Sequence, residues 1–290
     1  MANSCKQLDK YEKIREEVIF DINKTFKKNM IIGIILIPAF LIGILVIFYA
    51  YSKRERDLKE ISKKLKETLL HEIVKDNLGD NANYSSNNGI NLTEVMETGI
   101  INKPSSYKSE DLVYGTYKGI KYKSADIELK KIVQTYTPDG SVISSESLFF
   151  KGKYIRIDLI NNKDLIVVVK EKSNINNTKN IPGNINIELE SMAFNSKFDT
   201  KASSELDAFY VLTPQIQEKM LELESKFNGS INYIFKNGYL YILINDGRDS
   251  LEVLPKKKID SVFFNSIISD LTISLAVIDE FSLDSMKWTK

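Results

Sequence analysis

The chain has 290 residues, of which 43% are hydrophobic and 27% charged, and 40 basic and 39 acidic residues give it a formal net charge of +1. This balance is typical of a globular protein and excludes the broad positive field by which nucleic-acid-binding proteins attract their ligand. One histidine, His71, and one cysteine, Cys5, exclude most histidine-based catalysis, most zinc sites and any intrachain disulfide.

Residues 1–30 are predicted to form an amphipathic N-terminal helix. Apolar residues recur there at spacings of three and four, which places them on one face of a helix. The residues of this stripe are Leu8, Tyr11, Ile14, Val18, Ile22 and Phe26.

The stretch from Ile31 to Tyr51 contains no charged residue. At about 1.5 Å per residue, a helix of this length covers about 30 Å, the thickness of the hydrocarbon core of a bilayer. A cleaved signal peptide is a poorer explanation, because Tyr49-Ala50-Tyr51-Ser52 offers no cleavage site of small residues. We therefore expect residues 31–51 to be one transmembrane helix and the lipid bilayer to be a partner of this chain.

Basic residues flank the apolar stretch unevenly. The N-terminal side carries Lys24, Lys27 and Lys28, and the C-terminal side carries Lys53, Arg54, Arg56, Lys59, Lys63, Lys64 and Lys66. Because positive flanks stay inside, the sequence predicts a single-pass protein of the inner cell membrane with a cytoplasmic C-terminal domain. The N-terminal tail then lies outside. Since long domains sometimes cross despite such charges, an exported domain is the alternative.

Residues 52–79 are predicted to form a juxtamembrane helix with a second apolar stripe. The stripe consists of Leu58, Ile61, Leu65, Leu69 and Ile73. It could pack against the soluble domain, lie on the lipid surface, or form a short coiled coil that makes a homodimer through this stalk. The polar, asparagine-rich residues 80–90 are interpreted as a flexible linker.

Residues 91–290 are predicted to form a soluble α+β domain with antiparallel strands and two main helices. β-branched and aromatic residues favour strands over 112–117, 121–135, 142–159 and 165–170, and 192–198 and 208–212 also look extended. Asn237-Gly238 fits a type I′ hairpin turn. Thr213-Pro214 is a typical helix start, and a final helix is expected over 259–281.

The sequence contains none of the common catalytic or cofactor-binding motifs. It lacks a phosphate-binding glycine loop, a His-Glu-x-x-His zinc motif and paired Cys-x-x-Cys. Nothing in the spacing of the carboxylates brings two of them together. We accordingly assign no catalytic, cofactor-binding or metal-binding residue, and we expect a protein that is not an enzyme.

Several landmarks resemble, in their order and spacing, the bacterial family of domain of unknown function 3137. They include Ser109-Glu110-Asp111-Leu112-Val113-x-Gly115, Phe149-Phe150-Lys151-Gly152-Lys153-Tyr154, Ala208 to Pro214, and Met286-Lys287-Trp288-Thr289-Lys290. The resemblance covers roughly residues 94–290. Its landmark residues are Glu110, Asp111, Gly115, Gly152, Pro214 and Trp288.

This resemblance implies an uncharacterised membrane protein and lends no catalytic residues. Family members often carry two hydrophobic spans, whereas this sequence shows one. The resemblance also implies a possible protein partner, a small membrane-anchored helical protein called LemA. We expect a binding or scaffolding module; a membrane-anchored enzyme using carboxylates and an outward-facing structural envelope protein are the alternatives.

Overall fold

A computed structural model describes residues 2–35, 42–136, 141–159, 165–172, 184–252, 258, 260–285 and 288. The chain divides into two compact units. The helical unit comprises Met1–Asp76 and Leu251–Asp270, and the sheet unit comprises Asn77–Ser250 and Leu271–Lys290.

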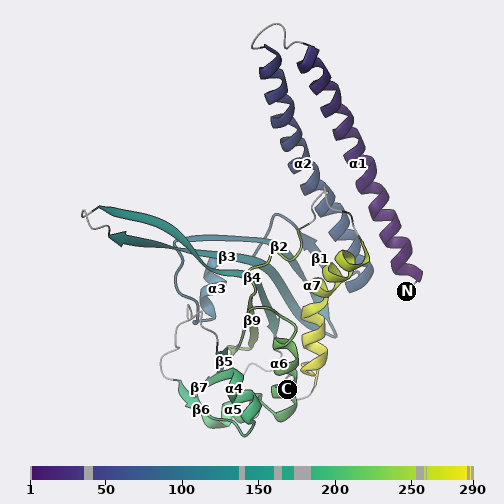
Figure 1. Ribbon diagram of the computed structural model, residues 1–290. Helices are drawn as coiled ribbons and strands as arrows, with labels where there is room; N and C mark the ends of the chain where they lie inside the picture. The colour runs from purple at the N-terminus through teal and green to yellow at the C-terminus, as the bar shows by residue number, and fades with distance from the viewer. Residues whose placement is uncertain are drawn as a thin grey trace. The chain divides into compact units, whose positions relative to one another are not determined.

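Two long helices, α1 (Ala2–Ile35) and α2 (Ile42–Leu78), form the main part of the helical unit. They run antiparallel, side by side (Figure 1). Three contacts fix their register: Lys10 Nζ lies 2.8 Å from Glu72 Oε2, Arg54 donates to Asn23 Oδ1 at 3.1 Å, and the rings of Phe26 and Tyr51 are 5.1 Å apart. We call this pair the α1–α2 hairpin.

The hairpin corrects the predicted single helix over residues 31–51. The described part of that segment is divided between the end of α1 and the start of α2, which run in opposite directions; residues 36–41, including Pro38, lie outside the described residues. A straight helix would place Phe26 and Tyr51 about 38 Å apart, yet their rings touch.

The two predicted apolar stripes supply buried residues of both helices. Tyr11 and Ile22 of α1 and Leu58, Leu69 and Ile73 of α2 are all less than 9% exposed. Each stripe therefore supplies residues that are buried within the chain, and the homodimer through the stalk stays a prediction.

A third helix, α7 (Ser261–Glu280), agrees with the predicted final helix. Among the described helices it is the one long and apolar enough to cross a membrane. Of its most apolar window, 44% is buried inside the protein, and its length and composition alone are weak evidence for contact with a membrane.

The sheet unit contains an antiparallel sheet of nine described strands in the order β1-β2-β3-β4-β9-β8-β5-β7-β6. The strands are β1 Ala82–Ser85, β2 Ser106–Tyr117, β3 Ile120–Tyr136, β4 Val142–Asp158, β5 Ile166–Glu171, β6 Ile185–Ile187, β7 Phe198–Ala202, β8 Ser230–Lys236 and β9 Tyr239–Asn245. The α+β class with antiparallel strands is thus confirmed.

The strand predictions agree with β2, β3, β4 and β5, and the Asn-Gly hairpin joins β8 to β9 as expected. Asn237 and Gly238 have φ values of 52° and 76°, the two positive values that a type I′ turn requires. Beyond Leu129, β3 and β4 continue as a two-stranded ribbon that extends past the other strands (Figure 1).

Four shorter helices accompany the sheet: α3 Leu92–Glu97, α4 Met192–Lys197, α5 Glu205–Val211 and α6 Pro214–Glu224. The extended structure predicted for 192–198 and 208–212 is largely wrong, because α4 and α5 occupy most of these residues. Capping decides the outcome: the hydroxyls of Ser191 and Ser204 accept hydrogen bonds from the amides of Phe194 and Asp207. In α6, Thr213 caps the helix as predicted.

The predicted linker over 80–90 is also different in the structure. Ala82–Ser85 forms β1, which pairs with β2 through Tyr84 opposite Val113. Tyr84 is 7% exposed and donates to Asp111 Oδ1 at 2.6 Å, so a buried hydrogen bond holds this segment against the sheet.

Candidate functional site

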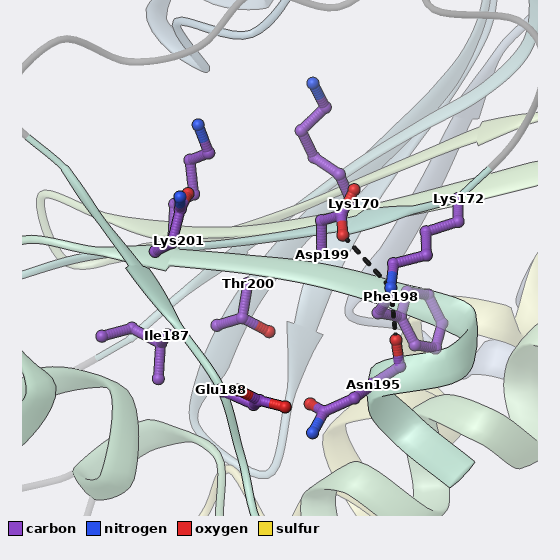
Figure 2. Close-up of a pocket in the computed structure, with 10 residues that line it drawn as sticks. Lys170, Lys172, Ile187, Glu188, Asn195, Phe198, Asp199, Thr200 and Lys201 are labelled. Atoms are coloured by element: carbon purple, nitrogen blue, oxygen red, sulfur yellow. Dashed lines mark hydrogen bonds and ion pairs between the residues drawn. The ribbon is translucent and has the colours of Figure 1, made fainter. Parts of the chain in front are cut away.

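An open groove of about 750 Å³ lies at the β5–β7–β6 end of the sheet. Figure 2 shows the side chains that line it. They are Lys170, Lys172, Asn186, Ile187, Glu188, Asn195, Phe198, Asp199, Thr200 and Lys201. This volume lies within the range of about 300–1,000 Å³ that is usual for small-molecule sites. We call it the β5–β7 groove.

The segment that joins β6 to β7 forms one wall of the groove. The side chain of Asn195 fixes this segment, because it donates to the Leu189 carbonyl at 2.6 Å and accepts from the Leu189 amide at 3.2 Å. Below the wall, the rings of Phe194 and Phe198 pack 4.9 Å apart, and both residues are almost fully buried. The wall therefore rests on an apolar anchor.

Lys172 ties β5 to the same wall. Its Nζ donates to the Asn195 carbonyl at 2.5 Å and lies 3.4 Å from Asp199 Oδ1, as the dashed lines in Figure 2 show. Its amide donates to the Lys197 carbonyl at 2.8 Å. Since these contacts use its charge internally, Lys172 acts mainly as a structural tie.

Lys170 and Lys201 differ from Lys172. Lys170 pairs with Asp199 across β5 and β7, and Lys201 pairs with Val168, so both lysines point to the same face. Figure 2 shows them extending to the same side of β7. Among the described residues, no side-chain hydrogen bond or ion pair engages either amine.

The environment of Lys170 disfavours its positive charge. Burial lowers the pKa of its amine below the ordinary 10.5, and the charge of Lys201 lowers it further, while Asp199 acts in the opposite direction. A bound anion would raise the pKa of Lys170 again, because a negative charge beside the two lysines stabilises the protonated form of both.

Thr200 points to the opposite face of β7 from the two lysines, because it lies between Asp199 and Lys201 and pairs with Val169 (Figure 2). The residue is 5% exposed, and its hydroxyl oxygen has no hydrogen-bond partner among the described residues. The lysine charge of the groove and the buried Thr200 hydroxyl therefore lie on different faces of the strand.

A second polar feature of the sheet unit is a group of three aspartates. Carboxylate oxygens of Asp111, Asp126 and Asp249 lie within 4.8 Å of one another. Asp126 accepts from the amide and hydroxyl of Ser250 at 2.7 and 3.1 Å, and Lys153 Nζ lies 3.6 Å from it. Oxygen ligands of this type suit a hard cation such as Ca²⁺ or Mg²⁺.

The space beside the aspartates is small. The cavity that borders Asp126 and Asp249 has about 40 Å³, which is room for a water molecule or an ion but not for a substrate. Lys153 is 5% exposed and Asp111 1%, so the group holds charged side chains inside the fold, with three carboxylates and one lysine. No spacing in the sequence predicts that these three aspartates lie together.

Most of the landmark residues lie in different parts of the structure and do not form one site. Asp111 lies in the aspartate group, at a bulge in β2 where its φ is 61°. Glu110 beside it lies 2.6 Å from Lys108 Nζ. Pro214 is the first residue of α6, and Trp288, 2% exposed, stacks on Phe235 with ring centroids 5.8 Å apart.

The two landmark glycines lie where a neighbouring strand leaves no room. A Cβ on Gly152 would stand 2.1 Å from the Ile244 carbonyl oxygen, and one on Gly115 would stand 2.7 Å from the Asn81 carbonyl oxygen. Both positions serve packing of the sheet, and none of the six landmark residues lines the β5–β7 groove. The groove could not be predicted from the sequence, because its lysines are ordinary strand residues without a motif.

Residues 149–283 match the family described as "Protein of unknown function (DUF3137)". This match confirms the family resemblance found in the sequence. No curated protein matches the chain.

One solved structure is similar in fold: "crystal structure of the mycobacterial trehalose monomycolate transport factor A, TtfA", with 6% sequence identity and a TM-score of 0.37. The likeness covers 69% of this chain and 88% of that chain.

Proposed function

We propose that this chain, over residues 149–283 a match to the DUF3137 family, is a membrane-anchored binding module that holds an anionic ligand in the β5–β7 groove. The observation that carries the proposal is the pair Lys170 and Lys201, which share one face without a side-chain partner among the described residues. Carboxylate and phosphate groups are the anions that such lysines recognise.

The size and lining of the groove support a ligand larger than a simple ion. Its volume of about 750 Å³ accommodates a molecule with several polar groups. An anionic group of such a ligand would meet Lys170 and Lys201, which extend to the same side of β7. Asn195 and Lys172 keep the wall in place, so little ordering is needed on binding.

Calorimetric titration of the full chain in detergent with citrate and with inorganic pyrophosphate tests the proposal. We expect saturable binding of at least one, weakened about tenfold by Lys201→Gln, because loss of one charge-assisted contact costs about 1.5 kcal/mol. Lys131→Gln, at an exposed lysine of the ribbon, is the matched control and leaves the affinity unchanged. Equal affinity of both variants would contradict the groove as the site.

The pH dependence of this binding follows from Lys170. Its pKa lies below 10.5, so its amine loses its proton at a lower pH than an ordinary lysine. Affinity for the anion therefore falls as the pH rises, starting below 10.5, and Lys170→Gln removes that part of the fall. Because burial disfavours the charge, Lys170→Gln leaves the fold at least as stable.

An enzyme using carboxylates is the alternative, and it receives little support. Asp111, Asp126 and Asp249 converge, and the cavity that borders Asp126 and Asp249 has about 40 Å³. A space of this size suits an ion better than a substrate.

The membrane anchor is the apolar stretch from Ile31 to Tyr51, and the sheet unit faces the cytoplasm. The uncharged length of the stretch and the basic residues beside it support this assignment. Proteolysis of the sheet unit in intact and in opened cells tests the side: protection in intact cells is expected, and cleavage there would favour an outward-facing envelope protein. The LemA-like partner stays a prediction.

A further inference from the structure

We infer that the apolar end of the α1–α2 hairpin enters a single leaflet of an anionic bilayer from one side and does not cross it. The apolar end comprises Ile31–Ile35 of α1 and Ile42–Tyr51 of α2. The inference rests on the membrane attachment proposed above and specifies its geometry. It places the N-terminus and the sheet unit on the same side of the membrane.

The opposite directions of α1 and α2 support insertion from one side. The Asn23–Arg54 hydrogen bond and the Phe26–Tyr51 ring contact set the two arms side by side just below the apolar end. Both boundaries of the uncharged stretch therefore lie at the same level. In a membrane-spanning helix, these boundaries would lie on opposite surfaces of the bilayer.

The exposure of the apolar side chains at this end of the hairpin also favours contact with lipid. Both arms of the apolar end present large apolar side chains to the surroundings, with exposed fractions between 42% and 72%. These residues are Ile31, Ile32, Ile34, Ile35, Ile44, Leu45, Phe48, Tyr49 and Tyr51. Exposed apolar surface of this density, on a segment without charge, is characteristic of contact with lipid.

The length of the α2 arm also favours insertion into one leaflet. From Ile42 to Tyr51 a helix rises about 15 Å, which is half of the roughly 30 Å hydrocarbon core. The α1 arm, Ile31–Ile35, rises about 7.5 Å. Each of these arms is therefore too short to span the bilayer.

The residues at the boundary of the apolar end are those expected at a membrane surface. Tyr49 and Tyr51 stand where the uncharged stretch ends, as aromatic residues do at a membrane surface. Next come Lys24, Lys27 and Lys28 on α1 and Lys53, Arg54 and Arg56 on α2. Because the arms are antiparallel, all six cations gather at the same end of the apolar segment, where they complement anionic headgroups.

A second consequence distinguishes this arrangement from the single span. With one span, the three lysines of α1 would be placed on the outer side, against the preference of positive flanks for the inner side. In the hairpin arrangement both basic flanks lie on the same side, so the conflict disappears.

Labelling of cysteines in sealed native membrane vesicles tests the inference with the full chain. Cys5, the single native cysteine, reports on the N-terminus, and Ser144→Cys in a Cys5→Ser background reports on the exposed ribbon of the sheet unit. A membrane-impermeant maleimide is expected to reach both positions from the same side. Labelling of one position only, with the other revealed by detergent, would overturn the inference in favour of a membrane-spanning helix.

Flotation with vesicles of phosphatidylcholine and phosphatidylglycerol tests the surface itself. Phe48→Lys, at a residue 72% exposed on α2, is expected to lower partitioning into the vesicles at least tenfold. Phe20→Lys is the matched control, because Phe20 is 67% exposed on α1 but lies outside the apolar end. Equal partitioning of the two variants would overturn the assignment of the apolar end.

The outcomes also separate this inference from the proposed function. If the unaltered chain stays in solution and does not float, membrane attachment itself is refuted. If it floats but Cys5 and the sheet unit are labelled from opposite sides, the attachment holds and the single-leaflet insertion fails.

Discussion

Strand β8 and the apolar end of the hairpin both carry large apolar side chains, but their surroundings are opposite. Every residue of β8 from Ser230 to Phe235 is buried, whereas Phe48 is 72% exposed and Ile35 69%. The sheet unit makes its own apolar environment from strands on either side. The hairpin buries the apolar stripe below its end and leaves the end uncovered, so an environment outside the chain must cover it. The predictions below test this contrast.

The largest effect is expected inside the sheet. Gly152→Ala would place a Cβ 2.1 Å from the Ile244 carbonyl oxygen, at a φ of 151°. We expect a loss of about 3 kcal/mol or more in the free energy of unfolding. Urea unfolding followed by the fluorescence of Trp288, the single tryptophan, measures it.

Gly119→Ala is the control for Gly152. Gly119 also has a positive φ, 79°, but nothing lies within 4 Å of an added Cβ. The expected loss is about 1 kcal/mol, from backbone strain alone. Equal losses at the two glycines would show that the close approach of β4 and β9 is not the cause.

Two leucines of α2 test the contrast within one helix. Leu70 is fully buried and Leu45 is 66% exposed. Leu70→Ala is expected to destabilise the fold by about 2–4 kcal/mol through the cavity it leaves. Leu45→Ala should leave stability in detergent unchanged and weaken only vesicle binding. Thermal unfolding followed by circular dichroism, together with flotation, separates the two effects; similar melting losses would refute the contrast.

Disruption of the aspartate group is expected to lower the free energy of unfolding by about 2–3 kcal/mol. Asp126→Ala removes the partner of the buried Lys153 and the acceptor for both groups of Ser250. The double variant Asp126→Ala with Lys153→Met removes both members of this ion pair, and its loss is expected to be smaller than the sum of the two single losses. Additive losses in the urea series would show that the two side chains are not coupled.

The smallest expected effect is a change of stability with pH that depends on Tyr122. Burial raises the pKa of Tyr122 to about 12. Below pH 10 the tyrosine is protonated in both the folded and the unfolded chain, so its contribution to stability is complete. Between about pH 10 and 12 only the unfolded chain ionises readily, and that contribution is lost. Urea midpoints at pH 9 and 11 should therefore fall less for Tyr122→Phe than for the unaltered chain.

Local patterns predicted much of the fold. The Asn237-Gly238 turn, the Thr213 cap and the strands from β2 to β5 follow from backbone preferences of a few neighbouring residues. The short helices α4 and α5 were missed because their aromatic and β-branched residues favour strands, while the caps at Ser191 and Ser204 decide for helix.

The long-range features could not be predicted in the same way. The uncharged stretch of 31–51 shows where lipid is met, but the direction of the second arm depends on contacts between residues as distant as Lys10 and Glu72. The β5–β7 groove likewise depends on the pairing of β5 with β7, which brings Lys170 and Lys201 to one face. Neither pairing leaves a spacing that a reader of the sequence could recognise.

The most direct measurement of the central claim is a distance between spin labels in reconstituted bilayers. The labels are attached to Lys24→Cys and Lys53→Cys in a Cys5→Ser background, with singly labelled chains as the control for contacts between molecules. Antiparallel arms predict about 10–20 Å between the labels, since packed helices lie 8–10 Å apart. One continuous helix would separate these positions by about 44 Å, and a distance near that value would contradict the account.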